Sequence, residues 1–232
     1  MLARMPRPTP LLSALLLLAG LPLIALAHGV SGRDAGFVMQ AEGVHLGPFA
    51  YLGAKHMVTG YDHLAFLAGV IFLLHRLRDV VIFASLFALG HTITLLGAVL
   101  GGWQADAYLV DAVIGLSVVY KGFENIGGLK ALGWKLDARA AVFGFGLVHG
   151  LGLATKVQAL EPSQDGLVLN LIAFNVGVEL GQVAALSVMV LLFALWRSTP
   201  GFSRAILPAN TVLMAVGFLL FGYQLSGFLL QN

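Results

Sequence analysis

Residues 56–67 read HMVTGYDHLAFL and begin an apolar run that continues to Leu74. The stretch carries two histidines, His56 and His63, and one aspartate, Asp62. A charged side chain at the centre of a bilayer costs about 2.5–3.5 kcal/mol on insertion scales, so such groups are kept where they bind or carry something. Imidazole and carboxylate are common ligands of divalent metal ions. The stretch therefore predicts a metal site inside a membrane-spanning segment.

The composition of the whole chain is that of a membrane protein. Of its 232 residues, 59% are hydrophobic and 10% are charged, whereas about 25% of the residues of a soluble domain are charged. The chain has no cysteine, which excludes disulfides, thiolate metal sites and iron–sulfur clusters. It has no Lys/Arg run for nucleic acid and no nucleotide-binding loop. We expect an all-α integral membrane protein surrounded by the lipid bilayer, with no nucleic acid or nucleotide as a partner, and the oligomeric state stays open.

The first 27 residues have the pattern of a secretory signal peptide. Arg4 and Arg7 form its basic region, residues 11–24 its apolar region, and residues 25–27 an Ala-Leu-Ala cleavage site. The apolar region is shorter than the about 20 residues that a membrane span needs. We therefore predict a cleaved signal peptide rather than a first membrane helix, followed by a short periplasmic segment over residues 28–53.

The remaining domain, residues 54–232, is predicted to contain six transmembrane helices. Each of its six apolar segments has about the length of a span, and their limits are residues 54–74, 79–101, 106–125, 139–157, 166–195 and 206–229. Basic residues gather in the loops after the first, third and fifth segments, namely Arg76, Arg78, Lys130, Lys135, Arg139, Arg197 and Arg204. The positive-inside rule places these loops in the cytoplasm. A multi-pass protein of the inner membrane with both mature termini in the periplasm is predicted.

Further ionisable groups lie in the middle of later spans. A lone histidine in a span is more often a hydrogen-bonded structural residue than a ligand, but here three spans present one at similar depth and a fourth presents a glutamate. A bundle that turns these groups inward gives them one another as partners. The predicted metal ligands are His56, Asp62, His63, His91, His149 and Glu179.

Amide side chains accompany these groups. At 100° per residue, Asn175 and Gln182 share a stripe with Glu179, while Gly177 and Gly181 lie on the opposite side and allow close helix packing. Near the inner end of the third span, Glu124 either contacts the ion or pairs with Lys121, three residues before it. The predicted pathway or supporting residues are Glu124, Asn125, Asn175 and Gln182.

These motifs resemble those of the HupE/UreJ family, membrane proteins associated with nickel and sometimes cobalt supply to hydrogenase and urease. The family's signature of histidine, five residues and Asp-His is met by His56, Asp62 and His63. The resemblance also covers residues 90–92, 124–125, 145–150 and 174–179. Members closest to the nickel permeases carry Phe-His-Gly-x-Ala-His-Gly-x-Glu, where this chain has Phe145 and Gly152 in place of the first His and the Glu. The resemblance implies a divergent branch, in which His91 and Glu179 complete the site.

Residues and resemblance together predict a transporter and not an enzyme. Its substrate is a divalent transition-metal ion, most readily nickel, with cobalt, zinc and copper also compatible with imidazole and carboxylate. Facilitated diffusion or exchange for protons would drive it, because the ligands bind metal in their deprotonated forms. The alternative is a membrane metalloenzyme, or a haem- or metal-binding accessory protein for metalloenzyme maturation.

The spacing within the first motif raises a geometric question. In a straight helix, His56 and His63 lie about 10.5 Å apart along the axis, too far for one ion with bonds of about 2 Å. We favour two stations, with His56 as the outer one; the alternative is an unwound segment around Gly60 that folds His56 back towards His63. Asp62 would orient a histidine or bind the ion from the side. Signal cleavage would also expose His28, whose amine and imidazole could capture metal.

Overall fold

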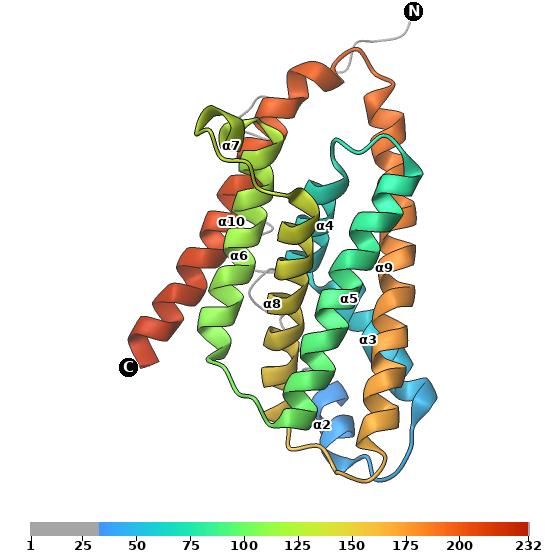
Figure 1. The fold of residues 1–232 in the computed structure, drawn as a ribbon. Helices are drawn as coiled ribbons and strands as arrows, with labels where there is room; N and C mark the ends of the chain where they lie inside the picture. Colours follow the sequence, from blue (N-terminus) through green and yellow to red (C-terminus); the bar gives the residue numbers. More distant parts are fainter. Residues whose placement is uncertain (1–32, 232) are drawn as a thin grey trace, which may run out of the picture.

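The computed structural model describes residues 33–231, and every regular element in this range is a helix (Figure 1). The all-α prediction is therefore confirmed for this part of the chain. The predicted signal peptide and His28 lie outside the described residues. The helices are α2 (Arg33–Gln40), α3 (Leu46–Thr59), α4 (Tyr61–Ile71), α5 (Leu77–Gly101), α6 (Ala107–Asn125), α7 (Gly128–Ala131), α8 (Ala138–Gln158), α9 (Leu167–Arg197) and α10 (Phe202–Gln231).

Four of these helices, α5, α8, α9 and α10, are long and apolar enough to cross a membrane. The chain is therefore a multi-pass membrane protein, but length and composition alone establish four spans where we predicted six. The third predicted span, α6, carries three charged side chains, those of Asp111, Lys121 and Glu124. The first predicted span is split into α3 and α4, which have 14 and 11 residues.

Glycine residues bring the long helices together in three pairs, α3 with α9, α5 with α8 and α6 with α10. A side chain at Gly53 would overlap the backbone of Phe174, and one at Gly177 would overlap the backbone of Ala50. The predicted packing role of the α9 glycines is thus confirmed, and α3 is the helix that they face. Gly146 plays the same part in the second pair, because a side chain there would overlap the backbone of Phe87 on α5.

The first predicted span breaks at Gly60. The Gly60 N–H donates to the His56 carbonyl at 2.9 Å and ends α3, the Gly60 backbone is extended (φ −73°, ψ 94°), and α4 begins at the next residue. A Cβ here would lie 2.8 Å from Nδ1 of His63, so a side chain would displace that imidazole. The straight helix behind our two-station model is wrong, and the alternative of a segment opened around Gly60 is the observed one.

The second half of the broken helix, α4, lies inside the bundle, and most of its residues are buried. Its C-terminal end is held by Arg197 at the end of α9, which donates to the carbonyls of Ile71 and Phe72 at 2.6 and 2.8 Å. These bonds satisfy carbonyl groups that a helix end leaves without intrahelical partners. Arg197 thereby fixes the buried half-helix against α9, the longest of the described helices.

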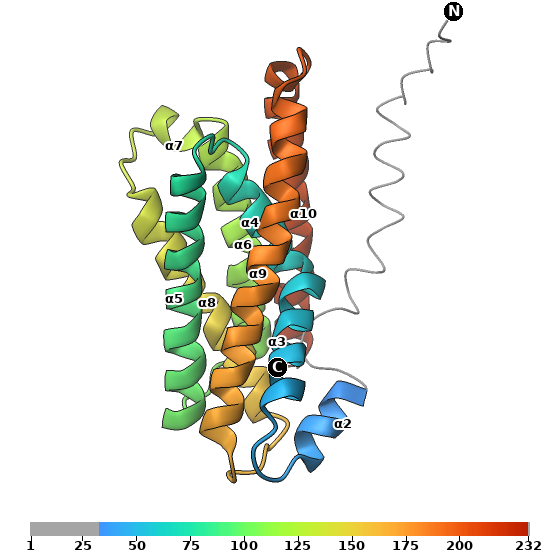
Figure 2. The ribbon, with the colours of Figure 1, turned by 90° about the vertical axis from the view of Figure 1, so that its right-hand side faces the viewer.

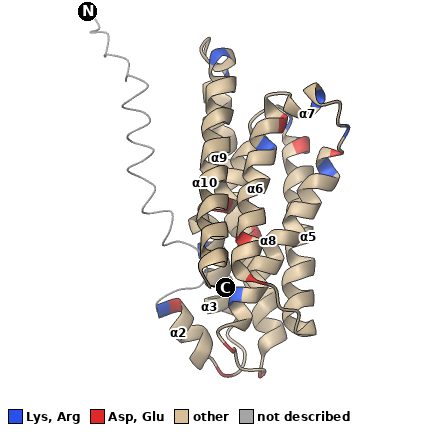
Figure 3. Cartoon of the chain, turned by 90° about the vertical axis from the view of Figure 1, so that its left-hand side faces the viewer, with Lys and Arg blue, Asp and Glu red and all other residues tan. Residues whose placement is uncertain are grey.

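The two ends of the bundle differ in charge. Figure 3 shows Lys and Arg at the end that carries α7 and the turn between α9 and α10. The other end holds α2, which lies beside the start of α3 (Figure 2) and is joined to it by the ion pair between Lys55 and Asp34 at 2.7 Å. Asn170 also ties α9 to the loop before α3, accepting from the His45 N–H at 2.7 Å and donating to the Gly43 carbonyl at 2.9 Å.

Candidate metal centre

Four imidazoles from four helices meet in the interior of the bundle: His56 on α3, His63 on α4, His91 on α5 and His149 on α8. The ring centroid of His63 lies 5.1 Å from that of His56, 6.0 Å from that of His91 and 4.8 Å from that of His149. One nitrogen each of His56, His63 and His91 lie within 4.8 Å of one another. Nitrogens that share one ion at about 2 Å each lie at most about 4 Å apart, so small side-chain rotations suffice to bind one.

Hydrogen bonds orient two of these imidazoles. His149 Nδ1 lies 2.8 Å from the carbonyl of Phe145, and because a carbonyl only accepts, Nδ1 carries the proton and Nε2 carries the free lone pair. His63 Nδ1 lies 3.1 Å from Oδ1 of Asp62, which selects the same tautomer. A carboxylate or carbonyl behind a histidine is the usual support of a metal ligand. Asp62 thus takes the first of its two predicted roles, orienting His63.

The other nitrogens of the cluster face one another. Among residues 33–231, no hydrogen-bond partner reaches Nε2 of His63, Nε2 of His149 or either ring nitrogen of His91. These three side chains are 1–3% exposed, and a buried polar atom without a partner costs about 1–3 kcal/mol. Most buried polar groups in proteins are paired, so several unpaired nitrogens in one place call for an explanation. A bound cation would satisfy one lone-pair nitrogen of each imidazole.

Aromatic rings close the cluster off on one side. Phe87 on α5 packs 5.0 Å from His149 and 6.1 Å from His63 between ring centroids, and Phe66 on α4 packs 5.5 Å from His149. Phe145 packs on Phe66 with ring centroids 5.6 Å apart. Its side chain therefore belongs to this apolar wall, while its carbonyl orients His149.

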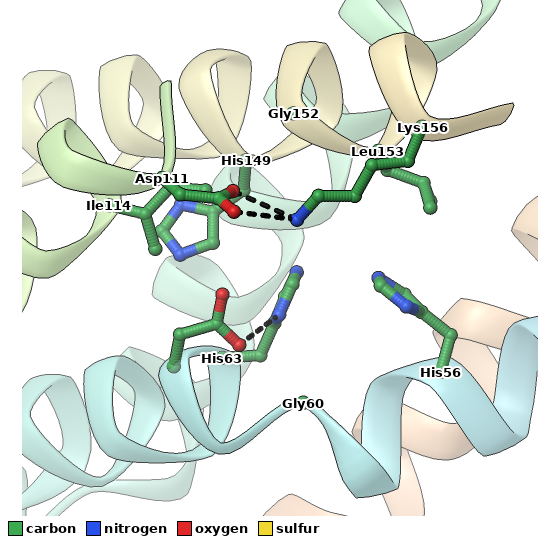
Figure 4. Close-up of a pocket in the computed structure, with 10 residues that line it drawn as sticks. His56, Gly60, His63, Asp111, Ile114, His149, Gly152, Leu153 and Lys156 are labelled. Carbon is green, nitrogen blue, oxygen red and sulfur yellow. Dashed lines mark hydrogen bonds and ion pairs between the residues drawn. The ribbon is translucent and has the colours of Figure 1, made fainter. Parts of the chain in front are cut away.

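On the other side lies a cavity of about 10 Å³, room for about one water molecule. It is lined by four polar side chains of the predicted site, those of His56, Asp62, His63 and His149, and by an ion pair that we did not predict (Figure 4). In this pair, Lys156 Nζ lies 2.9 and 2.8 Å from the two carboxylate oxygens of Asp111. The signal in the sequence was two opposite charges in separate apolar segments. Spacing along the chain does not show which residues on different helices contact each other.

The structure does not bring Glu179 to the histidines. The Glu179 side chain is exposed and lines a groove between α5 and α9, beside Thr92 and Gln182. The stripe that it shares with Asn175 and Gln182 faces the side of α5: Thr92 donates to Asn175 Oδ1 at 3.2 Å, and Gln182 donates to the Ala84 carbonyl at 3.0 Å. Our placement of Glu179 among the ligands is corrected, and Asn175 and Gln182 join two helices.

Glu124 and Asn125 lie at the basic end of the bundle. Glu124 accepts from Lys121 at 2.6 Å, which is the second of the two predicted possibilities. Asn125 donates to the Gly69 carbonyl at 2.8 Å and to Asn210 Oδ1 at 2.9 Å, and so connects α6 to α4 and α10. Neither residue lines the cavity beside the histidines.

Comparisons with known proteins agree with the motifs. A family model described as HupE / UreJ protein matches residues 32–232, a region that contains the whole histidine cluster and the Asp111–Lys156 pair. A comparison with curated proteins found no match, and neither did one with solved structures. The family model covers most of the chain, and the chain belongs to the HupE/UreJ family.

Proposed function

We propose that this protein transports a divalent transition-metal ion, nickel in the first place, across the inner membrane, and that the four-imidazole cluster binds the ion on its way. The observation that carries the proposal is the set of buried, unpartnered nitrogens of His63, His91 and His149 among the described residues. Membership in the HupE/UreJ family supports metal transport. The metal is the cargo of this site and not a resident cofactor.

The donor set favours borderline metal ions. Imidazole suits Ni²⁺, Cu²⁺, Zn²⁺ and Co²⁺, whereas thiolates, which select softer ions, are absent from the sequence. Three of the ligands come from the membrane interior, and Asp62 behind His63 supplies a negative charge that compensates the ion without binding it directly. A site on a transport path has to bind the ion strongly enough to take it in and weakly enough to release it.

We further infer six membrane crossings. The halves α3 and α4 would cross together as one broken helix, and irregular backbone at membrane depth is tolerated where it lines a cavity, as Gly60 does. Broken helices at the substrate site are a recurrent feature of transporters. The charges of α6 would be tolerated in the third crossing because each is paired, Asp111 with Lys156 and Lys121 with Glu124. The basic end would be cytoplasmic, and the mature termini periplasmic.

The mechanism we propose needs no nucleotide. The ion would enter the cluster from the periplasmic side and leave towards the cytoplasm, by facilitated diffusion or in exchange for protons, because imidazole binds a metal ion or a proton at the same lone pair. In either case His63 would be the central ligand, since its ring has the other three imidazoles around it.

Metal accumulation by cells that express the protein tests this proposal. Wild type, His63→Ala and His149→Ala would be compared for uptake of nickel, cobalt, zinc and copper, with the amount of protein in the membrane measured for each. We expect wild-type cells to accumulate nickel and both variants to lose uptake. His45→Ala is the matched control, because His45 contacts the Glu42 carbonyl at 2.8 Å near the bundle end and not the cluster. Uptake that persists in both cluster variants, or a haem band in the spectrum of the purified protein, would contradict the proposal.

A further inference from the structure

We propose that the Asp111–Lys156 ion pair is the entrance gate of the histidine cluster: the Lys156 ammonium holds the place of a cation on Asp111, and an incoming divalent metal ion displaces it before reaching the imidazoles. This inference rests on the proposed transport function. It assigns Asp111 as an entry ligand and Lys156 as an exchangeable counter-ion, neither of which belongs to the histidine motif.

The first argument is position. Asp111, near the start of α6, and Lys156, near the end of α8, lie at the bundle end opposite the basic loops, and both line the same small cavity as His63 and His149. Figure 4 shows the Lys156 side chain running along α8 to the Asp111 carboxylate, across the cavity from His63. An ion that leaves Asp111 therefore needs to cross only this cavity to meet the cluster.

The second argument is a gradient of exposure. The Lys156 side chain is 23% exposed and that of Asp111 is 7% exposed, while His149 behind them is 1% exposed. The ion pair thus stands between the surroundings and the buried nitrogens. Nε2 of His63 and Nε2 of His149 have no hydrogen-bond partner among the described residues. The incoming ion would reach these nitrogens once the ion pair is broken.

The third argument is charge. An ammonium next to the cavity repels a divalent cation from the cluster as long as it stays on Asp111, and this repulsion is strong in a medium of low dielectric constant. A metal ion that binds the Asp111 carboxylate displaces the Lys156 ammonium, and the repulsion falls as the ammonium moves away. The carboxylate then no longer needs Lys156 as its counter-ion. Asp111 is not left unsupported by the exchange, because Gln224 on α10 donates to its Oδ2 at 3.3 Å.

The fourth argument is space for the movement. At Gly152, one turn before Lys156, a Cβ would lie 3.1 Å from Val110 Cγ1 and 3.6 Å from Asp111 Oδ1. The missing side chain lets α6 bring its carboxylate against α8 and leaves the cavity side of Asp111 open. Lys156 is a long, flexible side chain in the last turn of its helix, where a cation interacts favourably with the helix dipole whether or not it bonds Asp111.

Nickel uptake by two single variants with opposite expected effects tests the gate. Asp111→Asn removes the entry charge, and we expect its half-saturation concentration to rise about tenfold, the effect of losing one charge-assisted contact. Lys156→Gln removes the competing cation and leaves the carboxylate free, so its half-saturation concentration should fall several-fold. A salt bridge with only a structural role predicts changes in the same direction for both variants, and that result would overturn the gate.

Two further measurements separate the possible failures. The amount of each variant in the membrane and nickel binding by the purified protein show whether the fold and the cluster are intact, and we expect both variants to reach the membrane in wild-type amounts and to bind nickel. Lys55→Gln and Asp34→Asn, which break an equally short ion pair at the same end but away from the cavity, should leave half-saturation unchanged. If the wild type takes up no metal, the transport function and the gate both fail. If it does and Asp111→Asn and Lys156→Gln match these controls, the gate alone fails.

Discussion

The histidine cluster and the polar stripe of α9 both place polar side chains at membrane depth, and they differ in how these are satisfied. In the stripe, Asn175 and Gln182 each bond a group on α5, at 3.2 and 3.0 Å. In the cluster, the inward-facing nitrogens of His63, His91 and His149 have no hydrogen-bond partner among the described residues. Of the two amides of the stripe, only Gln182 has a side-chain atom, Oε1, without a hydrogen-bond partner among the described residues, whereas in the cluster four nitrogens of three imidazoles have none. This contrast, rather than the residue types alone, separates support from site.

The largest expected effect comes from removing the centre of the cluster. Purified His63→Ala should bind nickel more weakly by over about 100-fold, beyond the about 10–100-fold that loss of a supporting residue costs. The His63 ring contacts both His56 and His149, so its loss removes the imidazole that lies between them. Isothermal titration of nickel into wild type and variant in detergent measures this, and unchanged affinity would remove the cluster from the binding site.

The next effect concerns the group behind that imidazole. Asp62→Asn keeps the shape of the side chain but removes the charge that fixes the His63 tautomer through Oδ1 at 3.1 Å. We expect nickel affinity to fall about 10–100-fold, with the melting temperature close to that of wild type. The same titration, together with thermal unfolding, provides the check. An effect as large as that of His63→Ala would show instead that Asp62 binds the ion itself.

A smaller effect, of a different kind, is expected in the stripe. Gln182→Leu loses one hydrogen bond to the Ala84 carbonyl and should lower the free energy of unfolding by about 0.5–1.5 kcal/mol. Nickel affinity should stay within about twofold of wild type, because Gln182 does not line the cavity beside the histidines. Thermal unfolding and nickel titration of one preparation give both quantities. Loss of nickel affinity without loss of stability would indicate that the stripe does belong to the metal pathway.

The smallest effect is expected for Glu179→Gln. Its side chain is exposed in a groove between α5 and α9, away from the cluster, and substitutions at exposed positions usually change stability by less than about 0.5 kcal/mol. Nickel uptake should therefore match that of wild type within about twofold. A strong defect in uptake with an intact cluster would indicate that the ion passes along this groove after leaving the histidines.

Much of the site followed from the sequence because its elements are long helices. Histidines at the middle of separate apolar segments predicted a shared centre, and His63, His91 and His149 form one. His56 joins it, although we favoured a separate outer station for this residue. Spacing within a helix also predicted the Lys121–Glu124 pair at 2.6 Å. Such inferences hold because side chains three or four residues apart share a helix face whatever the helix packs against.

The parts that sequence reasoning missed depend on packing between helices. Asp111 and Lys156 are 45 residues apart and meet only because α6 lies against α8. The orientation of α9 is set by Gly177, which lies against Ala50 on α3. Since Glu179 lies on the opposite side of α9 from this glycine, it is turned away from α3 and from His56. Gly177 and Glu179 lie on opposite sides of α9, so they could not both face α3.

The break at Gly60 also means that His56 and His63 are carried by helices that pack against different parts of the bundle. His56 belongs to α3, which packs chiefly against α9, while His63 sits on α4, which packs chiefly against α6. The two are joined by an extended residue without a side chain, so a displacement of α3 relative to α4 requires changes in only a few backbone dihedrals. Such a movement would alter the coordination number of a bound ion by one, keeping three imidazoles in place. One cluster could then hold the ion tightly in one geometry and release it in the other, with no separate low-affinity site.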